Sequence, residues 1–176
     1  MNTSRTPASP TSWAADTLAH DGLIRLISEI DDNGPLQRRM LATTLHGLSR
    51  RQLTHATTTG RRLGLLRTGR QGGNACYVLT SSGRDLAEIY DIAARWARAH
   101  HYPHPVSDFT TRVQATLTLL AQHPGTTTAD TGPDDEAART LNSVRSALSQ
   151  WAGDHGDALA TNPVPARAQA GMELAA

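Results

Sequence analysis

Nine arginines gather within residues 33–84, a stretch of 52 residues that contains no Asp or Glu. The stretch therefore carries a formal charge of +9, and because the whole chain carries +1, the other 124 residues carry −8. Charge segregation of this size indicates a surface that faces a polyanion, on an otherwise acidic protein. All 17 basic residues of the chain are arginines, whose planar guanidinium groups suit phosphate and guanine.

One helix is expected to display much of this charge. Ser49 is a good N-cap, and Gln52 stands three residues later, at the spacing of a capping box. The helix should run to about Leu63. Its inward stripe is expected to consist of Leu53, Ala56, Thr57 and Gly60. Its outward face is expected to show Arg50, Arg51, Thr54, His55, Thr58 and Arg61. A helix face with a single sign of charge is poorly stabilised alone, because like charges repel. The phosphates of DNA would neutralise such a face.

The interpretation of this face is major-groove recognition. Arg50 or Arg51 would reach guanine O6 and N7, and the neighbouring Thr54, His55 and Thr58 would contact bases or phosphates. The alternative is an ordinary solvated helix face, although such faces usually mix the two signs of charge. Five further arginines are expected to bind phosphates, setting affinity and salt dependence rather than sequence choice: Arg38, Arg39, Arg61, Arg62 and Arg67.

A β-hairpin is expected directly after this helix. Residues 65–68 and 75–80 are predicted to be short strands, and residues 69–74 a flexible, glycine-rich tip. On such a wing, Arg70, Gln71 and Asn74 would be aimed at the minor groove or its phosphates. The alternative is a mobile surface hairpin that carries one stray arginine.

Helices are predicted for the rest of the chain: residues 13–32, with a possible division at Gly22, then 36–45, 81–100 capped by Thr80, 107–122 and 134–152. The last carries Leu141, Val144, Leu148 and Trp151 at the 3-4-3 spacing of a helix-pairing seam. The expected fold class is mostly α with a small β-hairpin wing, a winged helix-turn-helix followed by C-terminal helices. The expected divisions are a disordered residues 1–11, a DNA-binding domain at 12–102, a helical region at 103–160, and a disordered tail at 161–176.

Several short motifs follow one another in the sequence: Gly34-Pro35, Leu41, Leu45-His46-Gly47-Leu48-Ser49, Leu53-Thr54, Gly64-Leu65-Leu66 and Tyr77-Val78-Leu79-Thr80-Ser81-Ser82-Gly83. In this order they resemble the HxlR group of winged-helix transcriptional regulators, within the broader MarR-like class. The chain departs from the group at Arg38, where the group has an aromatic residue, and at Met40, where it has an acid. The resemblance covers about 75 residues and stops near His100. It implies a regulator that binds double-stranded DNA.

Other residues suggest chemistry less strongly. Cys76 suggests a redox sensor, but a lone cysteine in an apolar strand is more often a small buried hydrophobe. His100, His101 and His104 suggest a metal site, but adjacent histidines without a carboxylate at ligand spacing are a weak signal, and a frayed, solvated helix end is the better explanation. Because no set of nucleophile, base and orienting group stands out, we expect no enzyme, no cofactor and no metal.

The remaining expectations concern location and partners. The single cysteine excludes an intramolecular disulfide, the N-terminus lacks the apolar segment of a secretory signal, and no membrane span is expected, so we expect a cytoplasmic protein. The expected partner is double-stranded DNA, bound by a homodimer that pairs through the N-terminal helix, residues 81–100 and the C-terminal helices. One alternative is an architectural or mobile-element DNA-binding or interaction module. Another is a regulator with a small-molecule effector, bound in an apolar pocket between the long helix and the C-terminal pair.

Overall fold

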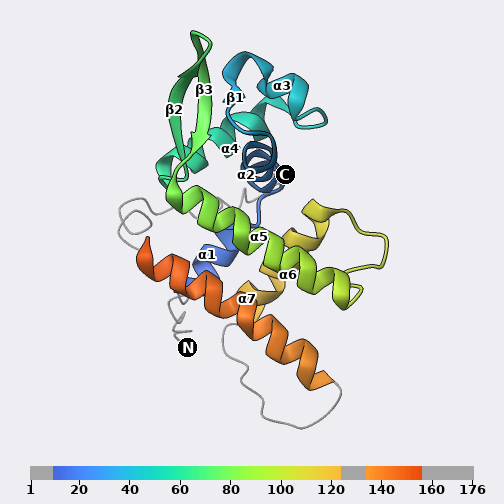
Figure 1. The fold of residues 1–176 in the computed structure, drawn as a ribbon. Coiled ribbons are helices and arrows are strands. Elements are labelled where there is room, and N and C mark those ends of the chain that lie inside the picture. The colour runs from blue at the N-terminus through green and yellow to red at the C-terminus, as the bar shows by residue number, and fades with distance from the viewer. Residues whose placement is uncertain (1–9, 124–133, 156–176) are drawn as a thin grey trace, which may run out of the picture.

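A computed structural model of the chain describes residues 10–123 and 134–155, which form a mostly helical fold with a small antiparallel sheet (Figure 1). The predicted fold class, mostly α with a small β-hairpin, is confirmed at this level. The elements are α1 Pro10–Leu18, α2 Asp21–Asn33, β1 Leu36–Gln37, η1 Arg38–Met40, α3 Leu41–Thr44, α4 Arg50–Arg62, β2 Leu66–Gln71, β3 Asn74–Leu79, α5 Ser81–Ala99, α6 Phe109–Gln122 and α7 Asp134–Asp154. None of the described helices is long and apolar enough to cross a membrane.

The sheet has three strands in the order β1-β3-β2, so β2 and β1 are its two edges. The prediction of a single helix over residues 36–45 was wrong at its start. Leu36 pairs with Tyr77 of β3 and Gln37 pairs with Cys76, and the 3-10 turn η1 and the short α3 follow. A strand of two residues exists only through its pairing with a distant strand, and the local sequence does not reveal that pairing.

The β2–β3 hairpin is longer and tighter than expected. Gln71 pairs with Asn74, so the turn consists of Gly72 and Gly73 alone, with φ angles of 55° and 80°. Both angles lie in the left-handed region, which glycine adopts without strain and which suits a two-residue hairpin turn. The prediction of a six-residue flexible tip was therefore wrong, because the strands run up to this turn.

The N-terminal helices divide at Ala19 and His20, not at Gly22. Gly22 lies inside α2, where a Cβ atom would come within 3.3 Å of the Gln52 carbonyl oxygen of α4. Its missing side chain therefore allows α2 and α4 to cross closely. Residues 10 and 11, expected to be disordered, belong to α1, and the Thr11 hydroxyl lies 2.9 Å from that of Ser149 in α7.

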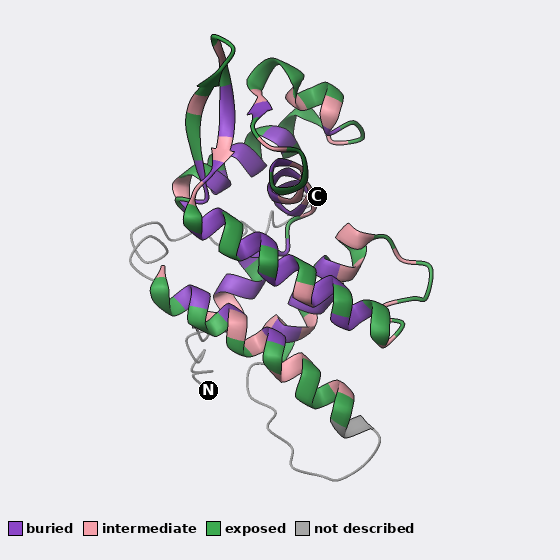
Figure 2. Ribbon diagram, viewed as in Figure 1, coloured by how far each residue is buried: buried purple, intermediate pink, exposed green. Residues whose placement is uncertain are grey.

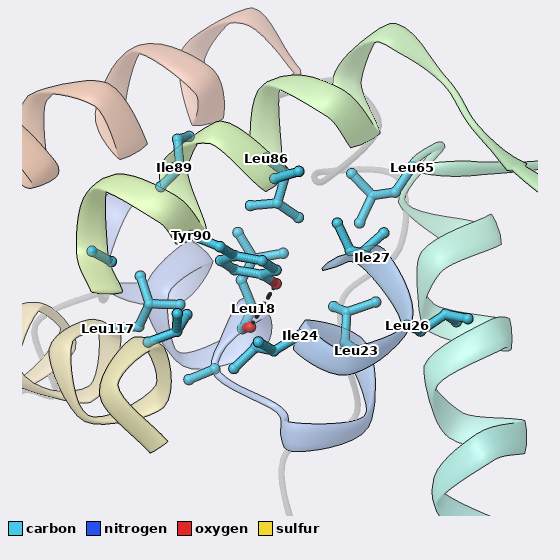
Figure 3. Close-up of a cluster of buried hydrophobic side chains, with 14 of the residues drawn as sticks. Leu18, Leu23, Ile24, Leu26, Ile27, Leu65, Leu86, Ile89, Tyr90 and Leu117 are labelled. Atoms are coloured by element: carbon cyan, nitrogen blue, oxygen red, sulfur yellow. Dashed lines mark hydrogen bonds between the residues drawn. The ribbon is translucent and has the colours of Figure 1, made fainter. Parts of the chain in front are cut away.

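Helix α5 runs through the middle of the molecule, between α4 with the sheet on one side and α1, α6 and α7 on the other (Figure 1). One hydrophobic core extends from Ala14 to Ala152. At its centre the hydroxyl of Tyr90 donates a hydrogen bond to the carbonyl oxygen of Leu18 at 2.9 Å (Figure 3), and burial raises the pKa of this phenol. The packing thus continues across the boundary expected at residues 102–103.

The seam expected on α7 packs within the same chain. Val144, Leu148 and Trp151 are buried against the layer formed by α1 and α5, and Leu141 is half-buried. The indole of Trp151 donates a hydrogen bond to the Ser82 carbonyl oxygen at 3.0 Å. The tail expected at 161–176 and most of the expected disordered N-terminus lie outside the described residues.

Candidate nucleic-acid interface

Helix α4 begins as predicted, at a complete capping box. The backbone N–H of Gln52 donates to the Ser49 hydroxyl at 3.3 Å, and the backbone N–H of Ser49 donates to Gln52 Oε1 at 2.8 Å. Two otherwise unsatisfied donors at the helix start are thereby satisfied. Both residues were predicted to bind DNA, and in the structure their side-chain oxygens hold the first turn of α4.

The two faces of α4 differ sharply in character. The predicted inward stripe is buried, and so is Thr59, which was not predicted. Buried and exposed segments alternate along the helices of the molecule in Figure 2. The hydroxyl of Thr57 is satisfied inside the protein because it donates to the Leu53 carbonyl oxygen at 2.9 Å. The exposed residues of the helix, apart from Gln52, are those of the predicted outward face: Arg50, Arg51, Thr54, His55, Thr58 and Arg61.

His55 is exposed but is held to one side of that face. Its ring makes an edge contact with the ring of His20, at a centroid distance of 4.9 Å. His20 lies in the connection between α1 and α2, so the His55 imidazole is directed toward this connection. It is therefore less free to reach a base than Arg51 or Thr54.

Arg25 is a positioning residue that the sequence did not single out. From α2 it donates a hydrogen bond through Nη2 to the carbonyl oxygen of His46 at 2.8 Å. His46 lies in the turn that joins α3 to α4, so this contact ties the approach to α4 onto α2. An isolated arginine in an amphipathic helix gives no sequence signal for such a role.

The hairpin presents a second set of polar side chains. Arg67, Arg70 and Gln71 of β2 are exposed along the edge of the sheet. Asn74 is half-buried, and its side-chain amide donates to the Gly72 carbonyl oxygen at 3.3 Å. Asn74 therefore stabilises the turn, whereas Arg70 and Gln71 extend from the strand that leads into it.

Arg38 and Arg39 lie elsewhere, beside the opposite edge strand β1. The guanidinium of Arg38 lies 5.6 Å from the ring centroid of Tyr77, at cation–π distance. Arg39 Nε donates to Gln37 Oε1 at 3.0 Å. The predicted site residues thus fall into two groups, a larger one on α4, its N-cap and the β2–β3 hairpin, and a smaller one on η1.

An open hollow of about 520 Å³ lies where the end of α4 meets β2. It is lined by Thr58, Arg61, Arg62, Leu66, Arg67 and Thr68. Three predicted phosphate-binding arginines, distant by up to six positions in sequence, converge here from two elements. Residues 33–84 contain no Asp or Glu that could offset this charge from within the same stretch.

The residues with alternative chemistry lie apart from this surface. The Cys76 thiol is buried at 1% exposure inside the sheet, the environment expected of a small hydrophobe. Within residues 10–123 and 134–155, no group of three or more His, Cys, Asp or Glu side chains is arranged to hold a metal ion. A second hollow, of about 570 Å³, lies between α5 and α7 and is lined mainly by Ile92, Trp96, Ala99, His100, Thr140 and Val144.

Comparisons with known proteins identify no relative. No protein family, no curated protein and no solved structure matches the chain. The resemblance to the HxlR group therefore stays a prediction that depends on the motifs quoted above.

Proposed function

We propose that this protein is a winged helix-turn-helix transcriptional regulator that binds double-stranded DNA in a sequence-specific manner. In this proposal α4 is the recognition helix in the major groove, and the β2–β3 hairpin is the wing. Support comes from the element order, in which α2, β1, α3 and α4 precede the two strands of the hairpin. The antiparallel sheet then joins the hairpin to the strand that follows α2.

One observation carries the proposal. The exposed face of α4 bears arginine and threonine side chains without a carboxylate, and it adjoins an edge strand that also bears exposed arginines. A solvated helix face normally mixes both signs of charge, whereas neighbouring arginines without carboxylates between them repel one another. A duplex removes this repulsion, because its phosphates neutralise the arginines and its major groove admits a helix.

The proposed roles follow from position on α4. Arg50 and Arg51 stand in the first turn, where recognition helices contact base edges, and either could pair with a guanine through its two donors. Thr54 lies one turn further along the same exposed side and would contact a base or a phosphate. Arg70 and Gln71, beside the hairpin turn, would reach toward the minor groove.

Selection of preferred duplexes from a random library, with the full chain, tests this function. A regulator should enrich a discrete motif and protect it from nuclease amid excess competitor DNA. The alternative, an architectural module, should give uniform binding with a steep salt dependence and no enriched motif. Failure to retain any duplex at low salt would contradict both.

The homodimer stays a prediction. Two recognition helices one DNA turn apart, roughly 34 Å, would require a pseudo-palindromic operator, which the enriched motif would reveal. The buried seam of α7 pairs with its own chain, so a dimer must use other surfaces of these helices. A small-molecule effector also stays a prediction, and the hollow between α5 and α7 lies where such a pocket was expected.

A further inference from the structure

We infer that the hollow between α4 and β2 is a phosphate-binding site that seats one backbone phosphate of the bound duplex. This inference rests on the proposed function and adds a defined anion site to it. The hollow joins the two parts of the interface, because Arg61 and Arg62 come from the end of α4 and Arg67 comes from β2.

Arg62 is the central residue of this site. Its side chain is half-buried, and its Nε atom is buried without a hydrogen-bond partner. Nε is also buried and unpartnered in Arg112 and Arg145, but both are held by other nitrogens, which donate to the carbonyl oxygens of Pro105 and His123. Arg62 makes no such bond to any described residue. A buried N–H donor without an acceptor costs free energy, so an anion that accepts from Arg62 would be strongly favoured.

The other lining groups suit the same ligand. Arg61 and Arg67 are exposed and add positive charge from two sides, and the exposed Thr58 and Thr68 contribute hydroxyl donors. The walls are held together below the hollow, since a Cβ atom on Gly60 would come within 2.6 Å of Leu66 Cδ1. Such close packing of α4 on β2 fixes the spacing of the arginines, so their donors are arranged before the ligand arrives.

The position of the hollow identifies the source of the phosphate. If α4 lies in the major groove and the hairpin reaches the adjacent minor groove, a single sugar–phosphate backbone separates them on the duplex. That backbone must pass between α4 and β2, which is where the hollow lies. A phosphate seated there would set how far α4 enters its groove, and would contribute to affinity without reading sequence.

The test uses the full chain with the enriched duplex and a scrambled duplex. Arg62→Gln is expected to weaken both by a similar factor, roughly tenfold, and to lower the slope of log affinity against log salt by about 1. Arg62→Lys should restore the slope, because it restores the charge, but not the affinity, because it lacks the forked donors.

Matched controls keep the result interpretable. Arg98→Gln, at an exposed position on α5, should leave affinity and slope unchanged, and circular dichroism should show that each variant is folded. If wild-type protein binds DNA while Arg62→Gln keeps full affinity and slope, the phosphate site is excluded and the DNA-binding function stands. If Arg62→Lys matches wild type in affinity, Arg62 contributes its charge alone and not its N–H donors. A phosphate bound in the hollow through hydrogen bonds from Arg62 is then excluded as well.

Inorganic phosphate provides a readout that does not require DNA. Added at constant ionic strength, it should shift the Nε–Hε NMR signal of Arg62 in the free protein and leave that of Arg98 in place. A shift in a protein that binds no duplex would support the anion site while contradicting the proposed function. An unmoved Arg62 signal, together with wild-type DNA binding by Arg62→Gln, would overturn the inference.

Discussion

Two arginines of α4 are expected to behave differently because their surroundings differ. Arg51 is exposed in the first turn, whereas Arg62 is half-buried at the end of the helix beside β2. A side chain that reads a base affects one sequence more than another, whereas one that binds a phosphate affects all sequences alike. The charge pattern of the sequence predicted that both arginines bind DNA. Only the folded chain shows that Arg62 and Arg67 line the same hollow.

Arg51→Ala is expected to weaken binding to the enriched duplex by roughly 1–3 kcal/mol and to relax the preference at one base pair. The reason is the loss of a bidentate contact to guanine O6 and N7. Titration against the enriched and scrambled duplexes measures the effect, with Arg98→Ala as the matched surface control. Equal affinities of Arg51→Ala and wild type for both duplexes would remove Arg51 from the interface.

Gly83→Ala is expected to destabilise the fold by roughly 1–3 kcal/mol or more. A Cβ atom at Gly83 would come within 2.3 Å of the Leu65 carbonyl oxygen, which belongs to backbone that cannot move aside easily. Gly153→Ala, in an open position near the end of α7, should be neutral or stabilising by about 0.5–1 kcal/mol. Urea unfolding compares the two, and equal midpoints would contradict the close packing of α5 on the Leu65 backbone.

At the scale of elements, helices defined by local signals were predicted well. Ser49 with Gln52 and Thr80 with Gly83 form the caps expected of α4 and α5, since a cap is made by residues three positions apart. Helix α6 is capped by Asp108 and begins at Phe109, two residues beyond the predicted start of the helix. Strand β1 forms by pairing with β3, about 40 positions further along the chain, so local patterns could not reveal it. The hollow beside β2 forms where two different elements, α4 and β2, meet, and local patterns could not reveal that either.

Ser49→Ala is expected to cost about 1 kcal/mol of stability, because an N-terminal donor of α4 loses its acceptor. DNA affinity should fall as well, since the first turn of α4 carries Arg50 and Arg51. Chemical denaturation and duplex titration of the same sample measure both effects. Ser146→Ala, at an exposed position inside α7, provides a control at which no helix start is altered.

The cap of α6 predicts a pH dependence. The backbone N–H of Thr111 donates to Asp108 at 2.7 Å and, with its side chain and then the charges of Arg25 and Arg112, lowers the pKa of this carboxyl. A lowered pKa in the folded state stabilises the protein above the ordinary value of 3.8, and this stabilisation is lost as the pH falls through and below that value.

Asp108→Asn keeps a capping side chain but removes this titration. Its melting temperature should lie below that of wild type at pH 7, and the difference should shrink toward pH 3. If the melting temperatures of the variant and wild type differ by the same amount at pH 7 and at pH 3, the titration of Asp108 does not contribute to stability in this way.

At the scale of the whole molecule, α6 and α7 cover surfaces of α1 and α5 that would otherwise meet water. Leu117, Val144, Leu148 and Trp151 belong to the same core as Leu18. Removal of everything after Tyr102 is therefore expected to expose this core and abolish cooperative unfolding. The truncation cannot report on self-association alone, because the remaining chain loses its fold as well as its candidate dimer surface.

The dimer is best tested on the intact chain. Light scattering coupled to size exclusion should give twice the chain mass of 18.9 kDa if the predicted homodimer forms. A mass of one chain at micromolar concentration would contradict it, and would then favour an operator with a single recognition site. The charge distribution predicts which side would face DNA under the proposed function, but it does not encode which helix faces remain free once α7 has packed.

The bonded and buried indoles have a spectroscopic consequence. The three tryptophans of the chain stand at Trp13 in α1, Trp96 in α5 and Trp151 in α7. The indole N–H groups of Trp96 and Trp151 donate to the carbonyl oxygens of Ala137 and Ser82. None stands in α4 or the hairpin, so intrinsic fluorescence will follow the melting of the helical layer and stay nearly silent when a duplex docks. A fluorophore attached near the hairpin turn would report duplex binding at a second emission wavelength. Recording both emissions from the same sample would separate DNA binding from unfolding.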